Sequence, residues 1–192
     1  MRRALVLGID GYKGQPLFGC VNDATSVASI IEKNGDGSPN FDIKLLTSNN
    51  GEITASLILE SLETLFKGSA ETVLFYFAGH GIIDPITNSG YIVSQEGKKG
   101  SWGIALVDLL DMANRASPKI ESTIIILDSC NSGFAGEVSS VSHTASIIGN
   151  GVTILTACQR DQNAQEASGQ GIFTRMLMDG LSGGSADILG RI

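Results

Sequence analysis

Thr72–Phe77, TVLFYF, and Ser122–Leu127, STIIIL, are the two stretches of sequence that decide the fold. Both are short apolar runs rich in β-branched and aromatic residues, a pattern typical of parallel strands that are buried on both faces. Each run leads into a reactive side chain: His80 lies between two glycines after the first run, and Cys130 follows the second. Because open α/β sheets place their ligand crevices at the carboxyl ends of the strands, we expect both side chains at one edge of one sheet.

Strand and helix patterns alternate along the rest of the chain, which predicts an α/β fold with a mostly parallel central sheet flanked by helices. The expected strands are 4–9, 42–47, 72–77, 122–127 and 152–157, and the expected helices are 23–34, 52–67, 105–115 and 171–181. Two stretches rich in glycine or serine, 84–103 and 133–151, are expected to be loops.

His80 and Cys130 have the chemistry of a nucleophile and its base. A thiol with the ordinary pKa of about 8.5 is a weak nucleophile, and a nearby imidazole can withdraw its proton. Taken alone, His80 would more often be a structural histidine and Cys130 a buried core thiol. Their joint placement after two predicted strands favours catalysis. His143, the other histidine, lies in the serine-rich loop and is expected to be exposed.

These motifs resemble those of the caspase-like cysteine peptidases, and among them the metacaspase and orthocaspase branch, with fingerprints Ser/Ala-Gly-His-Gly and Asp-x-Cys-x-Ser-Gly. The matching residues are Ala78–Gly81 and Asp128–Gly133, and the reactive pair is separated by 130 − 80 = 50 residues, an interval known from caspases. True caspases carry Gln-Ala-Cys-x-Gly, so Asp128 separates the branches. Matches at 4–9, 17–24 and 152–159 follow the family's order and extend the resemblance over most of the chain.

The resemblance implies a caspase-like, three-layer αβα fold and a cysteine endopeptidase with a Cys130–His80 dyad. The amide of Gly81, with that of Cys130, would donate to the oxyanion. Asp128 and Asp23 would line the pocket for the P1 side chain, the residue before the scissile bond, and Cys20 would lie beside it. Two carboxylates there favour Arg or Lys over an acidic residue.

Each of these pocket residues also has an ordinary structural interpretation. Asp23 fits an N-cap of the helix expected to start there. Asp128 fits a turn residue at the end of a strand, and Cys20 fits a small core residue. Ala78 stands where the family often has serine.

The resemblance also divides the single domain 1–192 into a large-subunit-like part, 1–132, a linker loop, 133–151, and a small-subunit-like part, 152–192. Residues 131–159 contain no Lys, Arg or Asp, so we expect no maturation by cleavage of the linker. The last residues resemble the beginning of a further element. The chain is therefore expected to be part of a longer protein, with a regulatory domain beyond Ile192.

The chemistry requires no cofactor, and no metal ligands are assigned. Many metacaspases respond to calcium through aspartates after the histidine. The corresponding oxygen donors here, Asp84, Gln95, Glu96 and Asp108, form a thin set for Ca²⁺, so activation by calcium is not expected. Lys98 and Lys99 are candidate self-cleavage sites, although a solvated charge pair on the loop is the commoner meaning of such residues.

Composition limits the partners and the compartment. The chain has 192 residues, 42% of them hydrophobic, and a net charge of −7. This composition argues against nucleic acid and anionic membrane and favours cationic peptides. The first apolar run is too short for a signal peptide or a membrane span, and three cysteines are an odd number without metal-type spacing. We expect a cytoplasmic protein.

Three other functions compete with a peptidase specific for Arg or Lys. A related peptidase with another P1 preference would not need Asp23 and Asp128. A catalytically silent scaffold or interaction domain is possible because a fold alone does not define a function. A nucleotide-binding domain of flavodoxin-like topology ranks last, because Gly8–Gly11 lacks the full phosphate-binding pattern.

Overall fold

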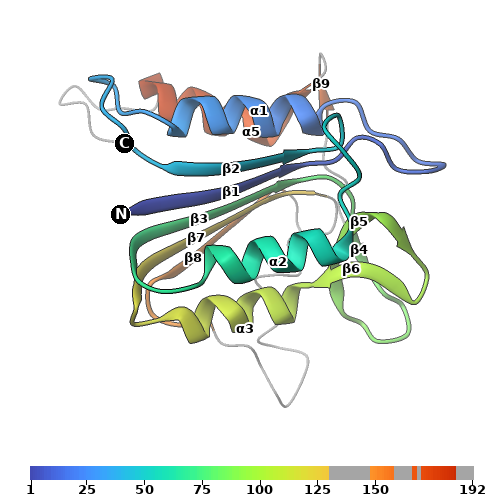
Figure 1. Cartoon of the computed structure of the whole chain (residues 1–192). Coiled ribbons are helices and arrows are strands. Elements are labelled where there is room, and N and C mark those ends of the chain that lie inside the picture. The colour runs from blue at the N-terminus through green and yellow to red at the C-terminus, as the bar shows by residue number, and fades with distance from the viewer. Residues whose placement is uncertain (130–147, 158–165, 168–169, 185–192) are drawn as a thin grey trace.

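A five-stranded parallel sheet forms the centre of the molecule (Figure 1). The computed structural model describes residues 1–129, 148–157, 166–167 and 170–184. The strand order is β2-β1-β3-β7-β8, and all neighbouring strands are parallel. The strands are β1 (Arg2–Gly8), β2 (Asp42–Thr47), β3 (Ala70–Ala78), β7 (Ile120–Asp128) and β8 (Val152–Thr156). The predicted α/β fold with a mostly parallel sheet is confirmed.

Helices cover both faces of this sheet and produce three layers (Figure 1). One face carries α1 (Cys20–Ile31) and α5 (Ile172–Asp179), which continues into the π-helical turn η1 (Gly180–Gly184). The opposite face carries α2 (Ala55–Leu65) and α3 (Leu106–Ala116). The predicted αβα layering is therefore present.

The alternation of side chains along β3 shows why its sequence is apolar throughout. Val73, Phe75 and Phe77 pack in the core under α2 and α3, whereas Leu74 and Tyr76 pack in the core under α1 and α5. Successive side chains of a strand point to opposite faces. A strand covered on both faces therefore needs apolar residues at every position.

A three-stranded antiparallel sheet follows β3, where the sequence had predicted a loop over 84–103. It consists of β4 (Gly81–Ile83), β5 (Gly90–Lys98) and β6 (Ser101–Ala105). The prediction was wrong because the glycines here allow close strand approach. Gly103 has φ +146°, and a Cβ on it would collide with the carbonyl oxygen of Ile92. A small antiparallel pair, β9 (Glu166–Ala167) and β10 (Gln170–Gly171), precedes α5.

Helix α1 begins three residues earlier than the sequence predicted. Its N-cap is Gly19, which has no side chain to cap the helix. Asp10, in the loop after β1, supplies the cap by accepting hydrogen bonds from the amides of Cys20 (2.9 Å) and Val21 (3.3 Å). Asp23 therefore lies in the first turn of α1 and is not the N-cap.

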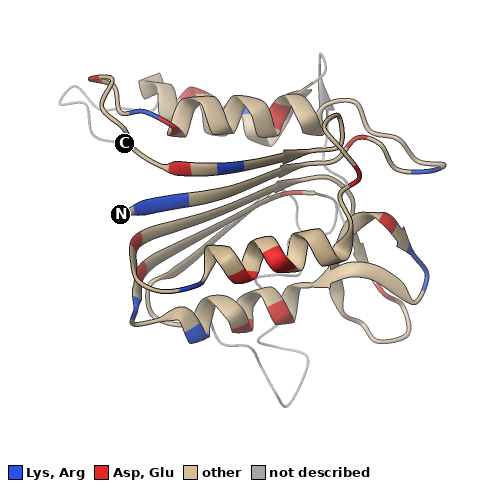
Figure 2. Cartoon of the chain, in the orientation of Figure 1, with Lys and Arg blue, Asp and Glu red and all other residues tan. Residues whose placement is uncertain are grey.

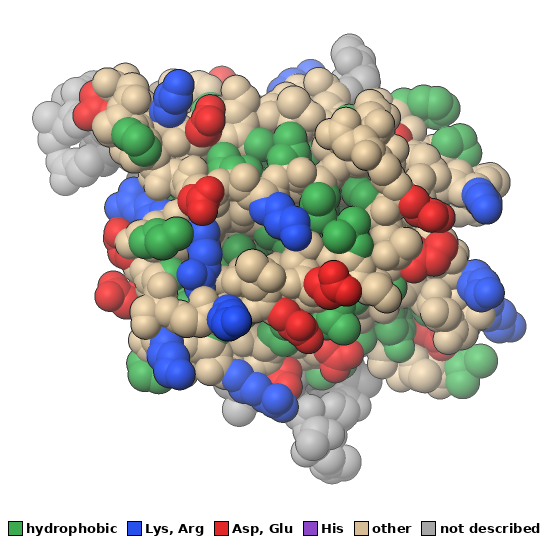
Figure 3. Space-filling model, viewed as in Figure 1, with side chains coloured by type: hydrophobic (Ala, Val, Ile, Leu, Met, Phe, Trp, Pro, Cys, Tyr) green, Lys and Arg blue, Asp and Glu red, His purple; other side chains and the backbone are tan. Residues whose placement is uncertain are grey.

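Charged side chains of both signs are distributed over the elements and loops (Figure 2). On the face seen in Figure 3, acidic and basic side chains are interspersed with apolar ones. None of the helices in the described ranges has the length and apolar character needed to cross a membrane.

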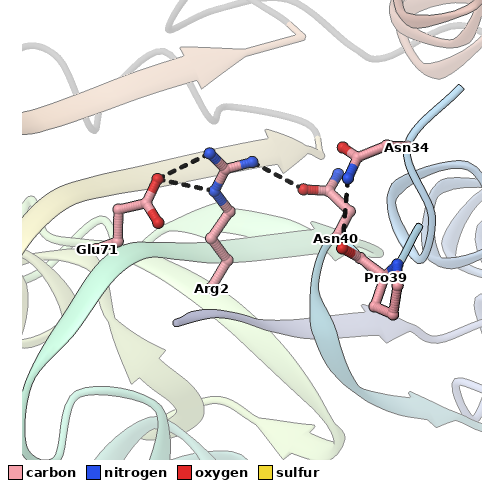
Figure 4. Close-up of polar contacts among 5 residues, drawn as sticks. All are labelled: Arg2, Asn34, Pro39, Asn40 and Glu71. Carbon is pink, nitrogen blue, oxygen red and sulfur yellow. Dashed lines mark hydrogen bonds and ion pairs between the residues drawn. The ribbon is translucent and has the colours of Figure 1, made fainter. Parts of the chain in front are cut away.

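Arg2 joins three segments at the amino ends of the strands (Figure 4). Its guanidinium donates to Glu71 Oε1 through Nε (3.0 Å) and Nη2 (2.7 Å), and to Asn40 Oδ1 through Nη1 (3.0 Å). The hydrogen bonds from Arg2 lower the pKa of Glu71. Asn34 extends the set by donating to the carbonyl of Pro39. These contacts hold the segments together at the amino ends of the strands. The site lies at the opposite edge of the sheet, where the strands have their carboxyl ends.

Candidate active site

The carboxyl ends of β1, β3 and β7 bring the predicted site residues together. Ala78 at the end of β3 pairs with Asp128 at the end of β7, and His80 follows Ala78 by two residues. The chain leaves β7 through the buried Ser129, which directly precedes Cys130 in the sequence. Cys130 itself lies outside the described residues, so its predicted role as the nucleophile stays a prediction.

The strand order reverses between β1 and β3, so this edge also contains the topological switch point of the sheet. β1 lies between β2 and β3, so the chain leaves β1 and β3 toward opposite faces. Such a point opens a crevice beyond the strand ends, where ligands of doubly wound sheets bind. His80 and the loop after β1 border this crevice.

Tyr12, in that loop, fixes the position of His80. The Tyr12 hydroxyl accepts a hydrogen bond from the His80 amide (3.1 Å) and donates one to the Val93 carbonyl (3.0 Å). The two aromatic rings are 4.5 Å apart between centroids and tilted by 53°. Burial raises the pKa of Tyr12, so the hydroxyl remains protonated and can donate.

The carbonyl of Gln15 fixes the tautomer of His80. Nε2 of the ring lies 2.8 Å from this oxygen. A carbonyl oxygen only accepts hydrogen bonds, so Nε2 must carry the proton. In the neutral ring the lone pair then resides on Nδ1, which is the atom that can remove a proton from a thiol.

The amide of Gly81 is directed away from the neighbouring strand. Val93 N–H donates to the carbonyl of His80 (2.9 Å), and Gly81 is paired with Ile92 in the antiparallel ladder. Hydrogen-bonded and non-hydrogen-bonded pairs alternate in such a ladder. The pair Gly81–Ile92 is thus non-hydrogen-bonded, and the Gly81 amide is positioned to donate to a ligand. Its role as an oxyanion donor stays a prediction.

Asp23 and Asp128 converge on one backbone position although they lie on different elements. Asp23 Oδ2 accepts a hydrogen bond from the amide of Gly171 (2.9 Å). A Cβ on Gly171 would lie 2.6 Å from Asp128 Oδ2 and 3.0 Å from Asp23 Oδ2. Both carboxylates are buried, with 2% and 6% of their surface exposed. The structure thus brings the two predicted pocket residues into a single acidic cluster.

A chain of hydroxyl groups supports Asp128. Thr174 on α5 donates to Asp128 Oδ2 (2.6 Å), and Tyr76 Oη lies 2.6 Å from Thr174 Oγ1. Thr174 has one hydroxyl proton, so Tyr76 must be the donor to Thr174. Burial raises the pKa of Asp128, and the contacts with Thr174 oppose this shift. Burial also raises the pKa of Tyr76, which keeps it a donor.

Cys20, the third predicted pocket residue, is the first residue of α1. Its side chain is 6% exposed and belongs to the core under α1 and α5. This core also contains Tyr76, so Cys20 lies near the hydroxyl chain. Its proposed contact with substrate stays a prediction.

Three of the four oxygen donors considered for calcium, Asp84, Gln95 and Glu96, have protein partners. The Asp84 carboxylate accepts from Trp102 Nε1 (2.7 Å) and from the amides of Ile86 and Thr87. The hydrogen bond from Trp102 is the main cause of its lowered pKa. Gln95 and Glu96 accept from the amides of Ile53 and Ala55. Within the described ranges, no group of three acidic, histidine or cysteine residues could hold a metal ion.

Four residues were not identified as site residues from the sequence: Tyr12, Gln15, Gly171 and Thr174. Gln15 acts through its backbone, which carries no sequence signal. Tyr12 lies in an irregular loop, and a buried tyrosine there is apparent only once the loop is folded. Thr174 carried a usable signal, because it is the polar residue in Ile172–Thr174, where an apolar helix face meets the sheet.

A solved structure shares this fold. Protein GSU0716 from Geobacter sulfurreducens matches with a TM-score of 0.71, covering 97% of this chain and 83% of that chain, at 15% sequence identity. At this identity the likeness shows the fold alone. A parallel sheet between two helical layers, with a histidine after one central strand and a cysteine motif after its neighbour, defines the class of caspase-like proteins.

The profile of the caspase domain, Peptidase_C14, matches residues 1–189, and the chain belongs to this family of cysteine peptidases. It is similar to metacaspase-1B of Aspergillus oryzae, with 28% identity over 187 residues, 90% of this chain and 44% of that protein. Metacaspase-1B of Aspergillus fumigatus is 27% identical over 192 residues, 92% of this chain and 46% of that protein. The family resemblance is confirmed, and the chain spans less than half the length of these relatives.

Replacing Tyr12 with phenylalanine removes the hydroxyl that joins His80 to Val93. We expect the free energy of unfolding to fall by about 1–3 kcal/mol, because buried backbone groups lose their partner. Urea denaturation measures the change. Tyr91→Phe is the matched control, since the Tyr91 hydroxyl has no hydrogen bond to the described residues. Equal stability of the two variants would show that the bridge does not hold His80.

Proposed function

We propose that this chain is the catalytic domain of a cysteine endopeptidase that hydrolyses peptide bonds after Arg or Lys, with Cys130 as nucleophile and His80 as base. One observation carries the proposal: the carboxylates of Asp23 and Asp128 meet at Gly171, at the sheet edge where His80 follows β3. A cationic side chain bound there would hold its own carbonyl group near the reactive pair.

The proposed reaction uses His80 first as base and then as acid. Nδ1 of His80 takes the proton of the Cys130 thiol, and the sulfur attacks the carbonyl carbon of the P1 residue. The Gly81 amide donates to the resulting oxyanion; such donors contribute on the order of 3 kcal/mol in other acyl-transfer enzymes. The proton on Nδ1 passes to the leaving amine as the C–N bond breaks. Water then hydrolyses the thioester, with His80 again accepting a proton, and restores the thiol.

The environment of Asp128 supports a basic P1 residue. Within the described ranges Asp128 forms no ion pair, and its carboxylate is buried, which raises its pKa. A buried carboxylate without a cation is unfavourable, and such groups are found disproportionately at functional sites. Arg can offset the cost with two parallel hydrogen bonds, whereas Lys supplies a single charge.

A silent scaffold domain is the second candidate, favoured by the same contacts. Thr174 and the Gly171 amide already donate to the two carboxylates. The aspartates would then do no more than dock α5 on the sheet. In that case their replacement would affect stability, and there would be no peptidase activity to lose.

Hydrolysis of fluorogenic peptides that differ only at P1 tests the proposal. Peptides with Arg, Lys, Asp or Ala at P1 are compared for the wild type and Cys130→Ala, with calcium and with a chelator. We expect cleavage after Arg and Lys that is absent in Cys130→Ala and equal with and without calcium. Preferred cleavage after Asp or Ala would refute the proposed pocket. No cleavage under any condition would favour the scaffold domain.

Gly171→Ala places a methyl group between the two carboxylates. The new Cβ would approach Asp128 Oδ2 to 2.6 Å, so the carboxylate must move. We expect kcat/KM for Arg peptides to fall about 10-fold or more, because the moved carboxylate no longer lies where it would bind a cationic side chain. Overpacking should also lower the free energy of unfolding by about 1–3 kcal/mol. Gly35→Ala is the control, because its Cβ would meet nothing within 4 Å. An unchanged kcat/KM in Gly171→Ala would separate the acidic cluster from substrate binding.

A further inference from the structure

A cavity of about 510 Å³ borders His80 on the side away from the acidic cluster. Three segments form its wall: the loop after β1, the start of β4, and the β5–β6 hairpin. The apolar part includes Ile82 and Trp102, and the charged part consists of Lys13, Lys98 and Glu96. The indole of Trp102 is fixed by its hydrogen bond to Asp84 (2.7 Å). The cavity therefore has a firm apolar wall and charged side chains at its rim.

The charged side chains that line this cavity, Lys13, Lys98 and Glu96, carry a net positive charge. The ion pairs within the described ranges are Arg2–Glu71 and Arg115–Asp111, so neither Lys13 nor Lys98 has an acidic partner there. Glu96 supplies one negative charge against the two lysines, and its Oε1 is held toward α2 by the amide of Ala55, which donates to it (2.8 Å). Basic segments occur on both the β1–α1 loop and the β5–β6 hairpin (Figure 2). Two lysines with no acidic partner in these ranges thus line one cavity in a chain of net charge −7.

The cavity and the acidic cluster lie on opposite faces of the sheet. Tyr12, Val93 and the residues around them belong to the core under α2 and α3. Tyr76 and Cys20, next to the aspartates, belong to the core under α1 and α5. His80 lies at the strand end between the two. A peptide whose P1 side chain reaches Asp128 would, after passing His80, continue into the cavity.

We propose that this cavity binds the leaving-group side of the substrate and that Lys13 and Lys98 select an acidic residue at the first or second position after the scissile bond. The inference rests on the proposed function and deepens it. The preferred substrate is then a basic residue followed by Glu or Asp. Its charge pattern mirrors the site, where an acidic cluster and a basic cavity flank His80. The aliphatic part of a glutamate can pack on Ile82 and Trp102.

Internally quenched peptides test this selectivity. They carry Arg at P1 and differ only at the next two positions, which are Glu, Gln or Lys. We expect kcat/KM to decrease in the order Glu, Gln, Lys, with about a 10-fold range, because exposed ion pairs contribute about 0.2–1 kcal/mol each. The range should narrow at high salt, since these lysines are exposed. The double variant Lys13→Glu/Lys98→Glu should reverse the order.

Two controls separate the possible failures. Lys119→Glu makes the same kind of charge change at the opposite edge of the sheet, just before β7, and should keep the order Glu, Gln, Lys. A reporter with Arg at P1 and only an aminocoumarin beyond the scissile bond lacks the selected residues. Hydrolysis of this reporter, together with equal rates for all three peptides, would overturn the inference and leave the proposed function intact. No hydrolysis of the reporter or the peptides would overturn both.

Discussion

His80→Ala is expected to lower kcat/KM for Arg peptides by about 10²- to 10⁴-fold, the range that a positioned general base contributes. The structure supplies the reason. Gln15 holds the proton on Nε2 and Tyr12 holds the ring, so the lone pair on Nδ1 is oriented before the substrate binds. Loss of the imidazole removes both the base for the thiol and the acid for the leaving amine.

The chain offers a matched control for this variant. His143 is its only other histidine, and His143→Ala should leave kcat/KM unchanged. Initial rates on one Arg peptide, measured for both variants at equal enzyme concentration, give the comparison. A His80→Ala protein as active as His143→Ala would remove His80 from the mechanism.

Asp128→Asn is expected to lower kcat/KM for Arg peptides on the order of 100-fold. Removing one partner of a buried, hydrogen-bonded charge pair costs about 2–5 kcal/mol. Asparagine keeps the shape of aspartate and can still accept from Thr174, so the loss reports the charge. Asp128→Lys should abolish cleavage after Arg and Lys altogether. Retained activity of Asp128→Lys on basic peptides would contradict the proposed pocket.

Asp128→Asn is expected to raise the free energy of unfolding at neutral pH, although it lowers kcat/KM. Burial raises the pKa of Asp128 in the folded protein, so the folded state binds this proton more tightly than the unfolded chain does. The contribution of Asp128 to the free energy of unfolding is therefore full at low pH and is lost as the pH rises through the raised pKa. At neutral pH the ionised carboxylate is destabilising, and Asp128→Asn should be the more stable protein.

Urea denaturation of the wild type and Asp128→Asn at several pH values measures this effect. The difference in unfolding free energy should be small in acid and should grow in favour of the variant toward neutral pH. A difference that does not depend on pH would mean that Asp128 titrates alike in the folded and unfolded chains. A variant that is more stable yet less active would show that the charge is retained for function.

Most of the fold could be predicted because the residue pattern that determines each strand or helix lies within that segment of the sequence. The five apolar runs and the intervening periodic segments define the sheet and its helices without knowledge of their partners. The β5–β6 hairpin was not predicted, because a glycine such as Gly103 is typical of a loop. In the structure, the backbone of Gly103 lies against the carbonyl group of Ile92. The start of α1 was misplaced because its cap comes from Asp10, ten residues before Cys20.

The candidate site could be predicted only in part, for a related reason. Asp128 is the last residue of β7 and His80 follows the end of β3 by two residues, so strand positions were enough to place them. The parts that orient them come from elsewhere in the chain: the carbonyl of Gln15 holds His80, and Thr174 holds Asp128. Such contacts form only when distant segments pack, so composition and spacing do not reveal them.

Covalent labelling of the active cysteine tests the central claim most directly. The protein is treated with peptidyl chloromethyl ketones that carry Arg, Lys or Asp at P1, and the modified residue is located by mass spectrometry of its peptides. The proposed function predicts one adduct, on Cys130, with the Arg and Lys reagents but not with the Asp reagent. It also predicts that His80→Ala suppresses this adduct. Labelling of Cys20, or of Cys158, the third cysteine of the chain, in place of Cys130 would contradict it, as would equal labelling by all three reagents.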